Sequence, residues 1–212
     1  MMAYAYVIGF LAQIFFSART LLQWILSEKT KKVVSPSLFW VLSLLGSYLM
    51  FVYGWVRNDF SILFGQLITY YVYIWNLHEK GLWNRFQVLF KLVLLLTPVV
   101  AILFVCGEAN EFIKLFFKND KIPFWMLIFG SLGQLIFTLR FIYQFFYSVK
   151  RKESILPMGF WVLSLLGSAI IIVYGFLRKD IVLIVGQSFG LVAYIRNIMI
   201  ELSSHQPSDS EI

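Results

Sequence analysis

The chain is poor in the residues on which soluble proteins rely. Of its 212 residues, 14% are charged and 60% are hydrophobic, whereas a soluble domain has about a quarter charged and about half apolar residues. It has one cysteine, Cys106, and two histidines, His78 and His205, which excludes an internal disulfide and a histidine-based metal site. The sequence contains neither a phosphate-binding loop nor a Ser/His/Asp set. We therefore expect a protein that is not an enzyme and that needs no cofactor and no metal.

Seven long apolar runs make up most of the chain. A helix needs about 20 apolar residues to cross the hydrocarbon of a bilayer. The runs are continuous rather than alternating, which excludes a transmembrane β-barrel. No Asp or Glu falls within them apart from Glu201, next to the end of the last run. We expect an all-α integral membrane protein with seven transmembrane helices, at residues 4–26, 38–56, 60–77, 86–106, 124–149, 158–177 and 181–202.

The basic residues predict the orientation of these helices, because Lys and Arg are enriched in cytoplasmic loops. Loops one, three and five carry nine of them: Lys29, Lys31, Lys32, Lys80, Arg85, Lys91, Lys150, Arg151 and Lys152. The other three loops carry six: Arg57, Lys114, Lys118, Lys121, Arg178 and Lys179. This bias places the N-terminus in the periplasm and the C-terminus in the cytoplasm. The net charge of +7 thus follows the topology and does not indicate a nucleic-acid partner.

The sequence contains an internal duplication. A shift of 121 positions aligns residues 9–76 with 130–197 without a gap, and 29 of the 68 pairs are identical. The nine residues at 39–47 recur unchanged at 160–168. Apolar composition alone does not reproduce Trp, Pro, Gln and Arg at one fixed offset. Two tandem copies of one unit are therefore the only reading of this pattern.

Each copy holds three of the expected helices, so the helix between the copies restores the orientation of the second one. We expect two parallel three-helix repeats joined by a linker helix, a SWEET-like 3+1+3 architecture. The divisions are a first repeat at 1–78, a linker helix with flanking loops at 79–122, a second repeat at 123–202 and a disordered polar tail at 203–212. A substrate site is expected on the axis between the repeats.

Two arginines stand inside the expected spans at matched positions, Arg19 and Arg140. An arginine there costs at least a few kcal/mol on insertion scales. We interpret the pair as the grip for an anion, most naturally a phosphate; snorkelling to the headgroups is the structural alternative. Arg196 is a third candidate cation for this site, although its counterpart is Trp75 and its place near a span end also suits snorkelling.

Amide side chains are duplicated as well, and neutral amides suit sugar hydroxyls because they both donate and accept hydrogen bonds. Interhelical hydrogen bonding is the alternative role for such residues. The expected headgroup-binding residues are Gln13, Gln23, Gln66, Asn76, Gln134, Gln144, Gln187 and Asn197. The matched serines Ser43 and Ser164 are expected to serve helix packing, and the Arg-x-Asp loops at 57–59 and 178–180 to anchor turns and an interface.

These residues form a recognisable motif set. The first copy reads Phe16-x-x-Arg19-x-x-x-Gln23-Trp24, then Ser35-Pro36-x-x-Phe39-Trp40, then Tyr53-Gly54-x-x-Arg57-x-Asp59 and Gly65-Gln66. The second copy ends in Gly186-Gln187 and Tyr194-Ile195-Arg196-Asn197. This set resembles the bacterial lipid-A-biosynthesis N-terminal domain family, which is grouped with the PQ-loop and SWEET superfamily. The copies depart from each other at Trp24 and Glu28, which become Phe145 and Val149, and at Trp75.

The resemblance implies a place in envelope glycolipid metabolism, in a Gram-negative inner membrane. It favours a flippase that moves an undecaprenyl-phosphate-linked monosaccharide, such as an aminosugar, to the periplasmic leaflet for lipid A or envelope glycan modification. The polyprenyl tail is expected to stay in the lipid through a gap between the repeats. Implied partners are the polyprenyl-phosphate sugar lipid, membrane lipids and an envelope glycosyltransferase. Two alternatives stay open: a SWEET-like facilitator of a small soluble sugar, and a non-transporting partner of such a glycosyltransferase.

Overall fold

The computed structural model describes residues 2–57, 59–107 and 123–204. These residues form seven α-helices and one 3-10 helix, and no strand. The elements are α1 (Met2–Thr30), α2 (Ser37–Val56), α3 (Phe60–Glu79), η1 (Trp83–Arg85), α4 (Val88–Gly107), α6 (Phe124–Arg151), α7 (Met158–Arg178) and α8 (Ile181–Ser204). The all-α expectation is confirmed. Residues 108–122 of the expected linker and 205–212 of the expected tail lie outside the described residues.

Five helices are long and apolar enough to cross a membrane: Tyr4–Thr30, Ser37–Val56, Phe124–Arg151, Met158–Arg178 and Ile181–Ser204. Helix α3 has the length, but Gln66, Asn76 and its tyrosines make it less apolar. In the described part of α4 the apolar stretch is Val88–Thr97. The expected spans thus correspond to helices, and five of them have the composition of a membrane span.

Several helices extend further than the apolar runs indicated. Helix α1 continues four residues further, to Thr30, and α3, α6 and α8 each continue two residues further, so Glu28 lies within a helix. The expectation that the spans hold no carboxylate is therefore wrong at the end of α1. The cause is local, because Glu28 bonds to Trp24 one turn earlier and to Arg196 of α8, and both contacts extend the helical packing beyond the apolar run.

The side chains are distributed as expected for a protein in lipid. Large apolar residues face outward, for example Val7 at 66% exposure and Leu103 at 65%, while Arg19, Gln23, Arg140 and other polar residues are buried. A soluble domain buries its apolar residues and exposes its charges. Together with the five apolar helices, this inverted distribution defines a multi-pass membrane protein.

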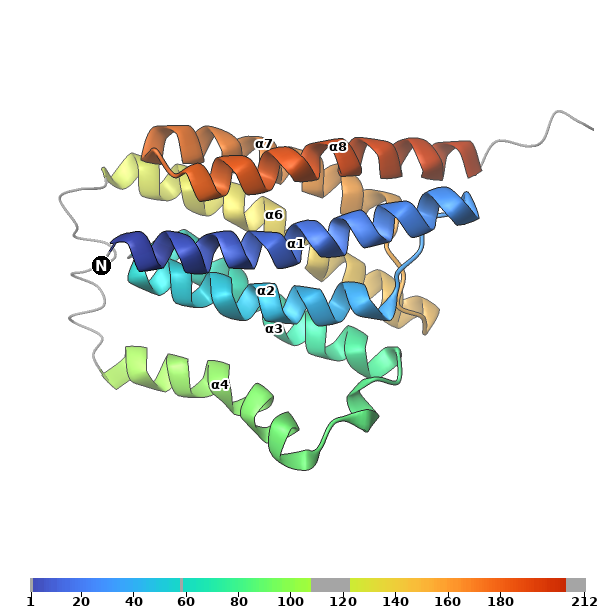
Figure 1. The fold of residues 1–212 in the computed structure, drawn as a ribbon, viewed down its shortest axis with the longest axis horizontal. Helices are drawn as coiled ribbons and strands as arrows, with labels where there is room; N and C mark the ends of the chain where they lie inside the picture. The colour runs from blue at the N-terminus through green and yellow to red at the C-terminus, as the bar shows by residue number, and fades with distance from the viewer. Residues whose placement is uncertain (1, 58, 108–122, 205–212) are drawn as a thin grey trace, which may run out of the picture.

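The helices of each copy pack in chain order, with α1 on α2 and α2 on α3, then α6 on α7 and α7 on α8. The copies meet along two seams, α3 against α6 and α1 against α8. Figure 1 shows this six-helix bundle with α4 set apart beside α2 and α3. The helices therefore enclose a common interior to which both copies contribute.

Short-range signals define the helix boundaries. Pro36 and Pro157, in extended conformation, precede α2 and α7, where the missing amide hydrogen of proline costs nothing. The Asp59 carboxylate accepts from the Ile62 amide and caps α3, and Asp180 likewise caps α8 through the amide of Val182. Such caps satisfy amides that the first helical turn leaves free.

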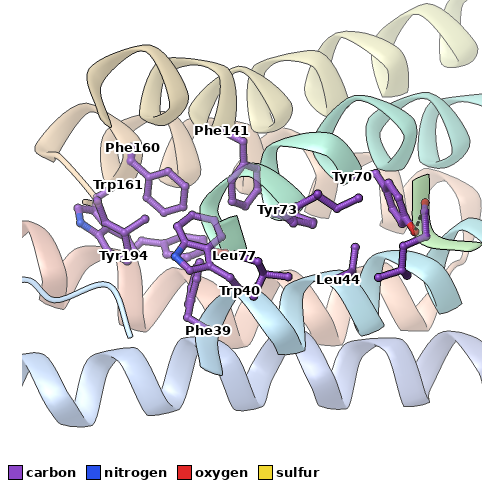
Figure 2. Packing of buried hydrophobic residues seen from close by; sticks show 13 residues of the cluster. Phe39, Trp40, Leu44, Tyr70, Tyr73, Leu77, Phe141, Phe160, Trp161 and Tyr194 are labelled. Carbon is purple, nitrogen blue, oxygen red and sulfur yellow. Dashed lines mark hydrogen bonds between the residues drawn. The ribbon is translucent and has the colours of Figure 1, made fainter. Parts of the chain in front are cut away.

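An aromatic layer fills the half of the bundle nearest the loops at 31–36 and 152–157. Figure 2 shows Trp40, Tyr73 and Phe141 converging there with Phe160 and Trp161. Edge-to-face contacts dominate, such as Tyr73 with Phe141 at 4.9 Å between ring centroids. This layer forms the floor of the polar interior.

Candidate functional site

A small polar pocket lies at the centre of the bundle, where both copies meet. It is lined by α1, α2 and α3 of the first copy and by α6 and α8 of the second. Six of the expected site residues are among its walls: Gln13, Arg19, Gln66, Gln134, Arg140 and Gln187. The structure therefore brings together three duplicated pairs that are 121 positions apart in the sequence.

The two arginines are held in matched ways within the pocket. Arg19 Nη1 donates to Ser43 Oγ at 2.7 Å and to the Tyr73 hydroxyl at 3.4 Å. Arg140 Nη1 donates to Ser164 Oγ at 3.1 Å and to Tyr194 at 3.2 Å. In each copy the serine comes from the second helix and the tyrosine from the third. These bonds fix one edge of each guanidinium and keep the cation away from the lipid headgroups.

Aromatic rings complete the environment of the two cations. The Arg140 guanidinium lies 3.5 Å from the centroid of Phe137 and 4.6 Å from that of Phe141. The Arg19 guanidinium lies 4.5 Å from Phe16 and 5.5 Å from the same Phe141 ring. Cation–π contacts of this kind stabilise a desolvated cation by about 2 kcal/mol. Phe141 thus links the two charges, and Thr20 takes its place in the first copy.

Neither arginine has a carboxylate partner among the residues that the structure describes. Both side chains are at least 95% buried, with exposures of 5% and 1%, and both Nε atoms are buried without a hydrogen-bond partner. A buried charge without a counter-ion costs several kcal/mol. The pocket therefore carries two positive charges and two free donors, a combination that attracts an anion with several acceptor oxygens.

Two glutamines cross from one copy onto a glycine of the other. A Cβ on Gly186 would lie 2.1 Å from Gln13 Oε1, and a Cβ on Gly65 would lie 2.0 Å from Gln134 Nε2. Each amide occupies the space that only glycine leaves open. The adjacent residues, Gln66 and Gln187, line the same pocket. Each Gly-Gln dipeptide thus contributes twice to the pocket. Its glycine makes room for a glutamine of the other copy, and its own glutamine lines the pocket.

The other four amides form a separate cluster nearer the aromatic layer, the amide clasp (Gln23, Asn76, Gln144 and Asn197). Gln144 and Asn76 exchange two hydrogen bonds, at 2.9 and 3.1 Å. Gln23 donates to Asn197 Oδ1 at 2.8 Å. All four are fully buried. They join α1 to α8 and α6 to α3, and the structure does not bring them to the central pocket.

At the opposite end a second symmetric cluster joins the copies, the carboxylate clasp (Tyr53, Arg57, Asp59, Tyr174, Arg178 and Asp180). The Tyr53 hydroxyl donates to Asp180 at 2.7 Å, and Arg57 pairs with the same oxygen at 3.3 Å. Tyr174 and Arg178 approach Asp59 at 2.9 and 3.8 Å. Burial raises the pKa of Asp59, and Arg178 partly offsets this effect. The Arg-x-Asp loops therefore both cap helices and bridge the copies.

Arg196 lies away from the pocket, at the α1–α8 seam. Its Nη2 donates to Glu28 Oε2 at 3.2 Å, and Nε donates to the other oxygen of that carboxylate. Trp24 donates to the same carboxylate at 3.0 Å. At the matched place of the α3–α6 seam, Trp75 stacks edge-to-face on Phe145 at 4.8 Å. Four residues at which the copies depart from each other are thus in contact across the seams, Glu28 with Arg196 and Trp75 with Phe145.

Several residues of the site were not assigned to it from the sequence. Ser43 and Ser164 were expected to pack, yet each accepts a bond from an arginine. Tyr73 and Tyr194 complete these contacts. A signal was present, because all four are duplicated, at 24 and 54 positions after their arginines. Duplication alone did not distinguish an arginine partner from a packing residue.

The fold and the site define a class: a multi-pass helical membrane protein with a buried, positively charged pocket between two sequence repeats. The model of the Lipid A Biosynthesis N-terminal domain matches the chain twice, at residues 8–78 and 129–199. The chain therefore belongs to this family, in two tandem copies, as the motifs indicated. No solved structure matches the chain.

Curated relatives carry the name of an enzyme. The chain is 32% identical over 200 residues to lipid-A-disaccharide synthase of Chlamydia pneumoniae. This alignment covers 91% of the chain and 33% of the relative. It is 29% identical over 207 residues to the synthase of Chlamydia trachomatis serovar D, covering 92% and 34%. The synthase of Chlamydia caviae is 28% identical over 205 residues, covering 92% and 33%.

These relatives correct one expectation and support another. The expectation that the protein is not related to an enzyme is wrong, because relatives that align along nine-tenths of the chain are named as synthases. The expected link to lipid A biosynthesis is supported by the family and by these names. The chain spans about a third of the length of the curated relatives that it matches.

Proposed function

We propose that the two repeats bind the phosphate-linked headgroup of a polyprenyl-phosphate monosaccharide and move it across the membrane for lipid A or envelope glycan modification. One observation carries the proposal: Arg19 and Arg140 share a buried pocket without a described carboxylate partner. A phosphodiester supplies the missing charge and the acceptor oxygens. The four glutamines around the arginines suit the hydroxyl or amino groups of the attached sugar.

The pocket has to widen before it can take such a headgroup. It encloses about 50 Å³, which is room for one or two water molecules. The amide clasp and the carboxylate clasp close the bundle on either side of it, and each clasp consists of contacts between the copies. In a SWEET-like pair of parallel repeats, opening one clasp at a time exposes the pocket to one side of the membrane.

The direction follows from charge. We place the protein in a Gram-negative inner membrane with loops 31–36 and 152–157 in the cytoplasm, as the basic residues favour. An outward-moving phosphodiester then carries one negative charge down the membrane potential, which contributes about 2.3 kcal/mol per 100 mV. This force makes an intramembrane proton or sodium site unnecessary.

A second candidate function is favoured by the relatives. Because they are named lipid-A-disaccharide synthases and are about three times as long as this chain, the repeats can hold a lipid-linked sugar for a glycosyltransferase rather than release it. The same pocket serves both functions. Transport of a soluble sugar has less support, because neutral amides suffice for it and the two buried arginines would have no role.

Reconstitution tests the proposal. Proteoliposomes receive undecaprenyl-phosphate aminosugar, and its movement between leaflets is followed for the wild type, Arg19→Gln and Arg140→Gln. Arg85→Gln is the matched control, because Arg85 is exposed in η1. We expect both pocket variants to lose movement and the control to keep it. Movement that survives in folded pocket variants would refute the phosphate grip. Binding without movement, lost in the same variants, would instead support presentation to a glycosyltransferase.

A further inference from the structure

A second cavity lies next to the central pocket and is entirely different in character. It has a volume of about 140 Å³, and its walls come from α2, α3 and Thr97 of α4. Val52, Leu67 and Tyr70 are among its lining residues, and almost the whole lining is apolar. An apolar cavity of about 150 Å³ stays free of water and can hold benzene. The space therefore suits about one five-carbon unit of a hydrocarbon chain.

Helix α4 covers this cavity without packing closely on the bundle. The Tyr70 hydroxyl donates to the Leu94 carbonyl at 3.0 Å (Figure 2), and the Tyr71 hydroxyl donates to the Leu95 carbonyl at 3.2 Å. In an α-helix the Leu94 carbonyl would accept a hydrogen bond from the amide of residue 98. Residue 98 is a proline and has no amide hydrogen, so this carbonyl is free to accept from Tyr70. The two tyrosine side chains thus connect α3 to α4 and keep the two helices one tyrosine side chain apart. The cavity lies between α4 and the bundle.

This arrangement exists in one copy alone. The positions that match Tyr70 and Tyr71 are Leu191 and Val192, which have no hydroxyl to donate. The cavity is therefore not a by-product of the duplicated fold. It comes from residues that the first copy has and the second lacks.

Gln66 connects the two cavities. It lines both the central pocket and the apolar one, and its Oε1 is buried without a hydrogen-bond partner. Its counterpart Gln187 lines the central pocket beside Arg140 but does not line the apolar cavity. The central pocket, which is polar and carries two positive charges, thus shares one wall residue with the apolar cavity. An anionic lipid has the same arrangement, with a charged head next to an apolar tail.

The seams between the copies do not offer an equivalent path. Arg196 and Glu28 bridge the α1–α8 seam, and Trp75 on Phe145 fills the corresponding part of the α3–α6 seam. The earlier expectation of a tail that leaves through a gap between the repeats finds no support in these contacts. The apolar cavity lies within the first copy, on the side that α4 covers.

We propose that this cavity holds the first isoprene unit of the lipid-linked substrate, with α4 as its cover and Gln66 as the junction between head and chain. The proposal rests on the proposed function, because it places the tail of the lipid whose phosphate Arg19 and Arg140 bind. It makes the two repeats unequal: both bind the head, and the first one guides the chain.

The duplication provides a matched pair of variants. Val52 is half-buried in the cavity wall, and its counterpart Val173 is exposed at 49% and lines neither cavity. Val52→Trp fills the cavity, whereas Val173→Trp adds the same bulk on the outer surface. Thr97→Trp fills the cavity from α4, outside the six-helix bundle, and covers the case in which Val52→Trp does not fold.

The probe is a polyprenyl monophosphate with a diazirine in its first isoprene unit, in phosphatidylcholine vesicles. Cross-linked peptides are identified by mass spectrometry. We expect cross-links on residues 47–52, 66–70 and 94–97, about tenfold fewer in Val52→Trp or Thr97→Trp, and no change in Val173→Trp. Cross-links on the seams that still require Arg19 would refute the chain site and leave the proposed function intact. Cross-linking that is unchanged in Arg19→Gln and Arg140→Gln would overturn the phosphate grip and, with it, the proposed site for the first isoprene unit.

Discussion

Asp180→Asn is expected to open the end of the bundle that the carboxylate clasp closes. The substitution keeps the shape of the side chain, and an asparagine also caps a helix, so the start of α8 is preserved. It removes the charge that pairs with Arg57 at 3.3 Å and that accepts from Tyr53 at 2.7 Å. The lost free energy is therefore that of the contact between the copies.

The size of the effect follows from burial. Breaking a buried pair by removing one partner costs about 3–5 kcal/mol. Here the side chains are 13% and 2% exposed. The single oxygen of the variant keeps the cap of α8, and its NH2 group can donate to the Tyr53 hydroxyl oxygen, so about 2 kcal/mol is the expected loss. This corresponds to about a thirtyfold larger open population. Glu28→Gln is the matched control, because its ion pair with Arg196 has side chains 29% and 40% exposed and such pairs contribute about 1 kcal/mol or less.

Thiol labelling measures the open population. The chain has a single cysteine, so Cys106→Ser gives a background without thiols, and Met50→Cys places a reporter in the pocket wall at a position that is 3% exposed. A membrane-impermeant maleimide should react about thirtyfold faster in Asp180→Asn than in its parent. The control should stay within about fivefold of the parent. Equal rates in the two variants would show that the carboxylate clasp does not close the pocket.

Three further changes have definite expected outcomes. Gly186→Ala displaces the Gln13 amide, whose oxygen would lie 2.1 Å from the new Cβ; headgroup affinity should fall while the unfolding temperature changes little, and unchanged affinity would remove Gln13 from the site. Asn76→Ala should destabilise the protein by about 1–2 kcal/mol more than Asn197→Ala in thermal unfolding, because Asn76 shares three bonds with Gln144 and Ser154 and Asn197 shares one with Gln23. Trp75→Arg should lower stability by about 2–4 kcal/mol, since it removes the ring contact with Phe145 and adds a charge to a seam that has Val149 in place of Glu28; a neutral result would show that the seam is open to water.

The helices and the duplication were predictable from the sequence because both are properties of long segments. Apolar runs of about 20 residues have few alternatives in lipid, and an identical block such as 39–47 and 160–168 leaves no doubt about the register of the repeat. The helix ends were less predictable. Helix α1 continues past its apolar run to Thr30 because Glu28 finds partners in Trp24 and Arg196, and one of these is 168 positions away.

The arginines and amides of the pocket were predictable from the sequence, but their grouping and the serine and tyrosine partners of the arginines were not. Duplication identified the arginines and all eight amides, yet the amides occupy two places: four line the central pocket and four form the amide clasp. Gln23 follows Arg19 by four residues in α1, so both lie on one face of that helix. The separation arises because Gln23 lies one turn nearer the loops, where Asn197 of the other copy is within 2.8 Å. Such a contact depends on how the copies meet, which no local pattern records.

The seams show why differences between the copies were harder to interpret than their identities. Taken along the chain, Glu28 against Val149, Trp24 against Phe145 and Trp75 against Arg196 are three unrelated departures from the repeat. In space, α1 packs on α8 and α3 on α6, so Glu28 meets Arg196 and Phe145 meets Trp75. At the α1–α8 seam the charge of Glu28 is balanced by Arg196 of the other copy, and at the α3–α6 seam the aromatic pair needs both rings. The departures are therefore two coupled exchanges, and each seam is consistent within itself. Tyr70 and Tyr71 fit the same logic, because both bond to α4 and both are replaced, by Leu191 and Val192, in the other copy.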